Sequence, residues 1–268
     1  MNIYLPMYHT LKQKVHLIVK KLSLDQYVQK RTGRKLALSI TDIFSLSLFR
    51  HLAQITTKKK LWELMEPRCS YKTLVVNINF FYPLALFILA LMLKQNRKDP
   101  HIIKFIDSTD LPVCTNRKAK HHKTMQTLAS WGRTGKGWFY GLKLHLVVDW
   151  QRRFLALKFT TGKTDDREIV LDLSKDLSGL FYADAGYISQ PLANTFHTEG
   201  TRALLAKPKA NMKRLATLVD VLFYDRRMHI ELDFRSLKMF WGLVSSLPRS
   251  IAGYLANYTY SLLAYCVR

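Results

Sequence analysis

Residues 224–238 read YDRRMHIELDFRSLK, a stretch without proline or glycine. Ile230, Phe234 and Leu237 recur in it at the three- to four-residue spacing of a buried helical face, so we predict a helix. Because successive residues advance by roughly 100°, four further side chains share a strip about 60° wide. They are Tyr224, Arg227, Glu231 and Lys238. A carboxylate flanked by cations suits a site where metal ions and phosphates meet, while an incidental ion pair on a solvated face is the ordinary alternative.

The whole chain is strongly basic. Its 268 residues include 42 Lys and Arg against 19 Asp and Glu, which gives a net charge of +23. With 48% hydrophobic and 12% aromatic residues, the composition indicates a folded protein and excludes a disordered one. Such an excess of positive charge repels itself unless a polyanion offsets it, so nucleic acid is the favoured partner. An anionic membrane surface is the alternative, and the even spread of the basic residues disfavours it.

The cysteines and the apolar segments bear on the compartment. Cys69, Cys114 and Cys266 lie far apart and lack the paired spacing of a zinc site or a disulfide framework, as is typical of a reducing compartment. The N-terminus shows no apolar core after a basic start, so we expect no secretory signal. The apolar run Phe80–Leu93 contains Pro83 and is shorter than the ~20 residues of a bilayer span, which predicts a buried helix and no membrane association.

The N-terminal part of the chain is predicted to be helical and basic. Residues 1–35 end in the cationic run Lys30–Lys35, which suits either phosphate contact or a solvated face. Ser39 and Asp42 predict a capping box at the start of one helix, and a second helix follows near Leu61–Met65. Short helices in a basic context fit a DNA-binding helix-turn-helix module, although any small helical bundle shows the same pattern.

A domain boundary is predicted in the polar segment Asn96–Pro100. Residues 1–98 are then a basic helical region that binds DNA, and residues 99–268 are a second domain. Immediately after the boundary, Ile102–Ile106 is a short apolar strand that delivers Asp107 at its end.

The second domain continues with a basic loop and a hairpin. The loop spans residues 117–123 and includes Lys118 and Lys120. Trp138–Asp149 and Phe154–Thr161 alternate in polarity around a polar turn, which predicts an antiparallel hairpin. Asp165 then opens a helix that ends near residue 175.

A further strand, Gly179–Ala183, delivers Asp184 at its end. A helix from about Ser189, a strand over Ala203–Ala206 and the helix at 224–238 complete the order. This alternation predicts an α/β fold, in which reactive groups lie where strands end. Two central strands lying side by side would bring Asp107 and Asp184 within reach of one ion.

Two strand-end aspartates and a helical glutamate would repel one another unless cations joined them. Hard oxygen ligands suit Mg²⁺ or Mn²⁺, and a pair of such ions supports in-line phosphoryl transfer. Asp110 is an alternative to Asp107, and Asp233 is an alternative to Glu231, although it points about 200° away on the helix. The alternative for Asp107 and Asp184 is a purely structural role as turn residues.

Four motifs in order carry a resemblance to a known family. They are IDS at 106–108 with LPVC at 111–114, YGLKLH at 140–145, ADAGYIS at 183–189, and Tyr224, Arg227, Glu231 and Lys238 on the last helix. From about residue 30 to its end, the sequence resembles insertion-sequence DDE transposases with a ribonuclease-H-like core, and is most similar to the insertion-sequence 982 family. The resemblance implies a ribonuclease-H-like mixed sheet flanked by helices and preceded by a small all-helical region.

The resemblance also implies a function. Asp107, Asp184 and Glu231 would form the catalytic triad and bind two Mg²⁺ or Mn²⁺ ions, with cleavage at element ends and strand transfer into target DNA. The expected DNA contacts are Tyr224, Arg227, Lys238, Lys143, Lys118 and Lys120. The expected partner is double-stranded DNA, bound by a homodimer in a bacterial cytoplasm. The alternative is a decayed or repurposed DNA-binding protein of the same fold.

Overall fold

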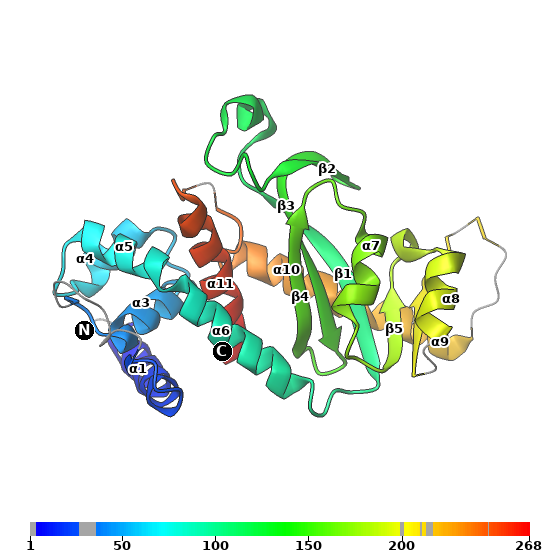
Figure 1. The fold of residues 1–268 in the computed structure, drawn as a ribbon, viewed down its shortest axis with the longest axis horizontal. Helices are drawn as coiled ribbons and strands as arrows, with labels where there is room; N and C mark the ends of the chain where they lie inside the picture. Colours follow the sequence, from blue (N-terminus) through cyan, green and yellow to red (C-terminus); the bar gives the residue numbers. More distant parts are fainter. Residues whose placement is uncertain (1–3, 27–35, 199–200, 210, 213–216, 246) are drawn as a thin grey trace. The chain divides into compact units, whose positions relative to one another are not determined.

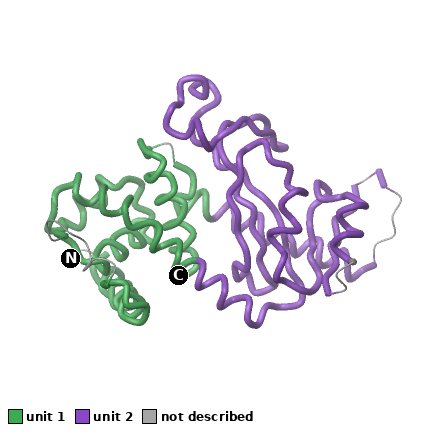
Figure 2. The backbone as a smooth tube through the Cα atoms, viewed as in Figure 1, with its two compact units in different colours: residues 1–89, 237–268 green, residues 90–236 purple. Residues whose placement is uncertain are grey.

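The computed structural model describes residues 4–26, 36–198, 201–209, 211–212, 217–245 and 247–268. The basic run Lys30–Lys35 lies outside these ranges. By its contacts the chain forms two compact units, Met1–Leu89 with Leu237–Arg268 and Ala90–Ser236 (Figure 2). The predicted boundary between residues 98 and 99 separates two domains that would each fold independently. The division into contact units does not test this, so the boundary stays a prediction.

The first unit consists of helices in the described residues. They are α1 (Tyr4–Lys21), α3 (Ile40–Leu52), α4 (Lys58–Met65), α5 (Tyr71–Phe80), the first half of α6 (Tyr82–Asn96) and α11 (Ile251–Val267). The capping box before α3 is confirmed, since the Ser39 hydroxyl accepts from the Asp42 backbone N–H. The helix near Leu61–Met65 is confirmed as α4.

Helix α11 was not predicted, yet it is central to the first unit. It packs against α3, where the rings of Phe44 and Tyr260 meet edge to face at 6.0 Å. The Arg50 guanidinium donates to the Asn257 side-chain oxygen at 2.6 Å. The C-terminal segment therefore completes the core that the N-terminal helices begin.

The apolar run at 80–93 is divided between two helices. Helix α5 ends at Phe80, and α6 begins at Tyr82 with Pro83 in its first turn, where proline is tolerated. The predicted burial is only half right, because Leu86 and Phe87 are 42% and 46% exposed. Over the described ranges no single helix is long and apolar enough to cross a bilayer, while α5 and α6 together, bent by 44°, have that length and composition.

The second unit is built on one mixed sheet (Figure 1). Its strands are β1 (Ile103–Pro112), β2 (Ser130–Thr134), β3 (Gly137–Asp149), β4 (Phe154–Thr161), β5 (Gly179–Ala183) and β6 (Arg202–Ala206). The order is β2-β3-β1-β5-β6, with β4 also paired to β3. β1 runs antiparallel to β3 and parallel to β5, and β5 runs parallel to β6. The predicted hairpin and the predicted fold class are confirmed.

Helices cover both faces of this sheet. On one face Phe181 packs in a buried cluster with residues of α7 (Asp166–Leu173) and α8 (Gln190–Thr198), including Phe196 at 5.1 Å. On the other face Tyr182 meets Phe223 of α9 (Leu218–Arg226) at 5.1 Å. Adjacent strand residues point to opposite faces, so β5 is a central strand buried on both sides.

Two predicted boundaries are wrong. The first strand does not end at Asp107, because pairing with β3 continues to Pro112 after pairing with β5 stops at Phe105. The helix predicted over 224–238 is two helices, α9 and α10 (Met228–Met239), which meet at Arg227. There the Ile230 N–H bonds to the Arg227 carbonyl only three residues back, a local tightening that apolar spacing does not reveal.

Candidate active site

The strand register places the two aspartates together. β1 and β5 pair in parallel with Phe105 opposite Tyr182, and two residues further along the same register lie Asp107 and Asp184. Asp107 has the same parity as Phe105, and Asp184, which is extended, has the same parity as Tyr182. Both therefore project toward the face covered by α9, Asp107 from within β1 and Asp184 from the residue after β5.

Arg227 joins two of the predicted acids. Its guanidinium donates to the Asp107 carboxylate at 2.9 Å and to the Glu231 carboxylate at 2.5 Å. The Asp107 and Arg227 side chains are 15% and 11% exposed, whereas that of Glu231 is 53% exposed. The guanidinium thus bridges one largely buried and one exposed carboxylate. Hydrogen bonds in which both partners are charged are stronger than those between neutral groups.

The electrostatics at Asp107 are those of a crowded acidic site. Burial is the main cause that raises the pKa of Asp107 to about 7; Arg227 and the Ser108 N–H oppose it, while the carboxylates of Asp184 and Glu231 act with it. Burial alone would lower the pKa of Arg227, but the carboxylates of Asp107, Glu231 and Asp184 outweigh it and raise that pKa. The acids and the arginine form one interacting group, and perturbed groups of this kind are typical of functional sites.

The donor set fits a hard cation by chemistry. Asp107, Asp184 and Glu231 supply only carboxylate oxygens. As they stand, no three His, Cys, Asp or Glu side chains in the described ranges are gathered tightly enough to hold a metal ion. The Arg227 guanidinium pairs with both Asp107 and Glu231 and so bridges these two carboxylates. The donor atoms suit a hard cation, and such an ion would compete with Arg227 for the Asp107 and Glu231 carboxylates.

The alternative acids lie elsewhere. Asp233 is fully buried and pairs with Arg152, so it has a structural role. Asp110 is three residues from Asp107 on one strand and therefore points to the opposite face, opposite Lys143 in register. Neither residue is placed to complete the triad.

Two predicted DNA contacts are placed inside the protein. Tyr224 is 8% exposed, its ring lies 5.5 Å from that of Tyr182, and its hydroxyl donates to the Ala206 carbonyl at 3.2 Å. Lys143 is 9% exposed and donates to the Asp166 carboxylate at 2.9 Å. Nonlocal packing engages each side chain, and Arg227 is equally buried at 9% exposure, so the roles of all three residues in DNA binding stay predictions.

The remaining predicted contacts are on surfaces or near them. Lys118 and Lys120 are exposed on the short 3₁₀ turn η1 (Asn116–His121). Lys238 is half-buried in the last turn of α10 and belongs to the first unit. Their roles in DNA binding stay predictions.

Tyr187, which sequence reasoning overlooked, lies beside the acids. It belongs to the 3₁₀ turn η2 (Ala185–Tyr187) and is 2% exposed. Burial raises its pKa well above the ordinary value, and the carboxylates of Asp107, Asp166 and Asp184 add to that effect. The sequence signal was its place in the ADAGYIS motif, three residues after Asp184, and no role was assigned to it there.

One family of known proteins matches the part of the chain that carries these acids. The model of the transposase DDE domain family matches residues 97–250, more than half of the chain. No curated protein sequence matches it. Among solved structures, a piggyBac transposase synaptic complex with hairpin DNA is similar with a TM-score of 0.54 and 10% identity, over 91% of this chain and 71% of that one. That likeness concerns the fold alone, which is ribonuclease-H-like.

A Mos1 transposase paired-end complex with the left transposon end has 13% identity and a TM-score of 0.27, over 89% of this chain and 80% of that one. A TM-score this low does not show a shared fold.

Proposed function

Because the chain belongs to the family of transposases with a DDE domain, we propose that it is an insertion-sequence transposase of the 982 type. It cleaves DNA at the ends of its element and joins the freed 3′-hydroxyl to target DNA, within a bacterial cytoplasm. The support for the finer assignment is the order and spacing of the four motifs that end in Tyr224, Arg227, Glu231 and Lys238.

One observation carries the catalytic part of the proposal. Asp107 from β1 and Glu231 from α10 are joined by Arg227, and Asp184 at the end of β5 acts on the same Asp107 carboxyl. Residues 107, 184 and 231 are far apart along the chain, so the fold alone brings them to one place. Apolar residues of similar volume would stabilise a fold as well as such an acidic cluster does, so stability alone does not explain the cluster.

Asp107, Asp184 and Glu231 would hold two Mg²⁺ or Mn²⁺ ions. Bound ions supply activation of the attacking oxygen and stabilisation of the leaving oxygen. Arg227 neutralises Asp107 and Glu231 while no ion is held, and its planar fork suits a phosphate once it is released. The low exposure of Asp107 keeps its carboxyl in a fixed orientation.

Double-stranded DNA is the proposed partner, held by a homodimer. The +23 net charge and the exposed Lys118 and Lys120 support a polyanion. The piggyBac transposase, which has a similar fold, is described in a complex with hairpin DNA, and this agrees with the choice.

A nicking and joining assay tests the function. The substrate is a supercoiled plasmid that carries the terminal repeats flanking the gene, incubated with Mg²⁺. Asp107→Asn, Asp184→Asn and Glu231→Gln should each abolish cleavage while DNA binding is retained. Asp110→Asn on the opposite face of β1 and the exposed Asp225→Asn on α9 are matched controls that should cleave normally.

The same assay separates the alternatives. Salt-sensitive DNA binding by the unaltered chain without any Mg²⁺-dependent nicking would favour a decayed DNA-binding protein. Nicking without preference for the ends, and without joined products, would indicate a general nuclease of this fold. Cleavage that persists in one of the three acid variants would remove that residue from the triad.

A further inference from the structure

The segment from the end of β1 to the residue before Asp149, the last residue of β3, contains no acid. From Leu111 to Val148 the sequence has seven Lys and Arg residues and neither Asp nor Glu. Six of the seven are in or beside two connections, the loop after β1 and the β2–β3 turn: Arg117, Lys118, Lys120, Lys123, Arg133 and Lys136. This segment of the second unit is therefore positively charged, and it contains no acidic side chain that would neutralise the charge.

Aromatic side chains are interleaved with these cations on one face of the β2–β3 hairpin. Cross-strand pairs place Trp131 opposite Tyr140 and Arg133 opposite Trp138. Because residues two apart on a strand share a face, these four side chains lie on the same side of the hairpin. The Trp131 and Tyr140 rings meet at 5.6 Å, and the Arg133 guanidinium lies 5.9 Å from the Trp138 ring.

This face is open to solvent. Trp131 is 42% exposed, Trp138 is 60% exposed, and Arg133 is exposed as well. Tryptophan is among the most buried residues on average, so two exposed neighbours of this type indicate a surface that meets a partner. The opposite face carries Phe139, which is 6% exposed and belongs to the core.

The hairpin is held rigidly on the sheet. A Cβ at Gly132 would lie 2.2 Å from the Gly162 carbonyl oxygen, so the two backbones are in direct contact there. Gly137 has a positive φ of 115° at the turn, which favours glycine. The aromatic face is therefore a fixed platform.

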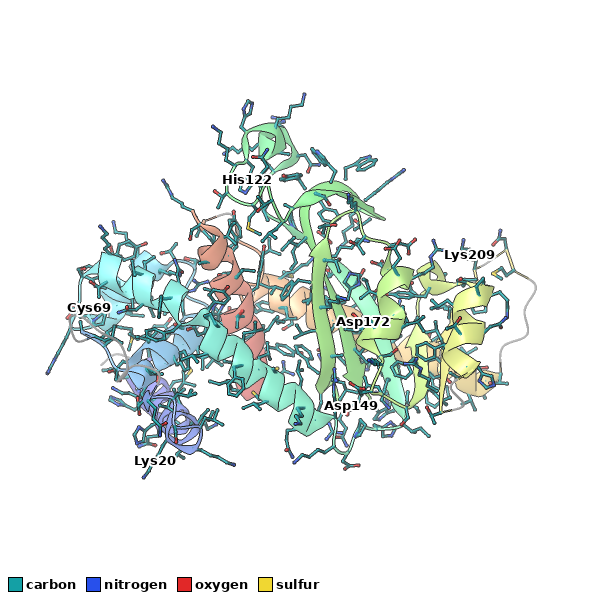
Figure 3. All side chains as sticks on the ribbon, in the orientation of Figure 1. Lys20, Cys69, His122, Asp149, Asp172 and Lys209 are labelled. Carbon is teal, nitrogen blue, oxygen red and sulfur yellow. The ribbon has the colours of Figure 1, made fainter. Side chains whose placement is uncertain are left out.

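The basic loop is attached to this platform. Asn116 donates to the Trp138 carbonyl at 2.8 Å, and the His122 ring lies 6.4 Å from that of Tyr140. In Figure 3, His122 is labelled on the loop that projects next to β2 and β3. Lys118 and Lys120 of that loop are exposed, so cations stand beside the exposed rings.

We propose that the face formed by Trp131, Arg133, Trp138 and Tyr140, here called the aromatic platform, binds unpaired nucleobases of a DNA strand whose phosphates lie on the basic loop. Aromatic rings alternating with cations are the usual combination for single-stranded nucleic acid, because every base can stack while the cations follow the backbone. Positive charge without acids favours a DNA strand over an apolar peptide.

The distance from the aromatic platform to the proposed catalytic acids agrees with the binding of a DNA strand that is cut at those acids. Along β3, Leu146 lies opposite Asp107, and Tyr140 is six residues further, which is roughly 20 Å at the rise of a strand. The platform is thus on the same sheet as the proposed catalytic acids and a few nucleotides away from them. Tyr224, an aromatic residue that the sequence resemblance places among the DNA contacts, is buried, whereas the platform is accessible.

This inference rests on the proposed function, and the test separates the two. The unaltered full-length chain is titrated with two probes of equal duplex length, one blunt and one with a three-nucleotide single-stranded overhang that contains 2-aminopurine. We expect tighter binding of the overhang probe and quenching of 2-aminopurine fluorescence by stacking. Trp138→Ala should weaken binding of the overhang probe by about 5- to 150-fold and remove the quenching, with blunt-duplex affinity unchanged.

Further variants control for folding and for general exposure. Trp138→Phe keeps a ring and should restore most of the preference. Ile102→Ala removes another exposed apolar side chain, 63% exposed just before β1, and should leave both affinities unchanged. Arg133→Gln should reduce the slope of log affinity against log salt by about 0.7 on the overhang probe, as loss of one contact to a single strand would.

The outcomes are distinct. Loss of the overhang preference in Trp138→Ala, with unchanged blunt-duplex affinity, supports the platform. Equal binding of both probes by the unaltered chain, or an unaffected Trp138→Ala variant, overturns the platform and leaves the proposed function standing. Failure of the unaltered chain to bind either probe at low salt overturns the proposed function and the inference together.

Discussion

Two buried arginines in the two units have opposite surroundings. Arg227 in the second unit is 9% exposed and lies between carboxylates, whose influence raises its pKa. Arg50 in the first unit is 8% exposed, and burial lowers its pKa to about 10. The same side chain is thus stabilised in its charged form in one place and destabilised in the other.

The neighbours of Arg50 explain the difference. Its guanidinium donates to the Asn257 amide oxygen, an uncharged acceptor, and no carboxylate in the described ranges forms an ion pair with it. His51 and Lys58 line the same small cavity of about 10 Å³, and burial and the Arg50 charge lower the pKa of His51 well below its ordinary value. Burial and the Arg50 charge lower the pKa of Lys58 to about 7.

The meaning of a buried charge therefore depends on its neighbours. A buried charge without an opposite charge costs stability, and an amide offsets only part of that cost. At Arg227 the acids and the cation compensate one another, so removing the cation leaves the acids without an opposite charge. A buried arginine alone is therefore no sign of a functional site, and at Arg227 the proposal rests on the acids that converge on it.

The sharpest test of this contrast is the pair Arg227→Met and Arg50→Met. Methionine has a similar length and no charge. Arg227→Met leaves the Asp107 carboxyl buried without its partner, so the free energy of unfolding should fall by roughly 2–4 kcal/mol. Arg50→Met removes a desolvated charge and leaves one amide oxygen unpaired, so its change should stay within about 1 kcal/mol. Urea unfolding at pH 8 with EDTA measures both, and equal losses would contradict the contrast.

A second test uses pH in the first unit. The folded-state pKa of Lys58 is about 7, below its ordinary value of 10.5, so between these values the unfolded chain binds more protons than the folded one. Stability should therefore rise with pH from about 7 toward 10.5, by at most about 1.4 kcal/mol per pH unit. Urea midpoints at pH 7, 8 and 9 measure the slope.

Matched variants assign that slope to one side chain. Lys58→Met should flatten the slope and raise stability at pH 7. Lys59→Met alters the adjacent lysine, whose side chain is 72% exposed, and should keep the slope of the unaltered chain. A slope that survives in Lys58→Met would show that another group is responsible.

The sequence predicts features that depend on local patterns, and it does not predict those that depend on pairing between distant residues. The apolar run before Asp107, the strand end before Asp184 and the Arg227–Glu231 spacing are local patterns, and the acids of the candidate site were predicted from them. The Lys143–Asp166 ion pair joins residues 23 apart across two elements, and no local pattern reveals it. That pairing is why a lysine expected to face DNA lies inside the protein.

Two further misses have physical causes. Helix α11 is apolar around its whole circumference because it lies in the core, so it lacks the polar face by which an amphipathic helix is recognised. The strand β2 contains Gly132, which lowers its strand propensity but permits the close contact with Gly162. In both cases the residues are fitted to neighbours that are distant in sequence.

The smallest expected effect concerns the stability of the acid variants. The raised pKa of Asp107 means that the folded protein favours the uncharged carboxyl, because burial and the charges of Asp184 and Glu231 outweigh Arg227. Asparagine is uncharged and of equal size, so Asp107→Asn at pH 8 in EDTA should leave the free energy of unfolding unchanged or raise it by about 1 kcal/mol or less. Glu231→Gln changes a side chain that is 53% exposed and should lower it by about 1 kcal/mol or less. Thermal unfolding of both variants beside the unaltered chain measures these shifts. A clear loss of stability in Asp107→Asn would mean that its bond to Arg227 holds the fold together, and that the acidic cluster is structural.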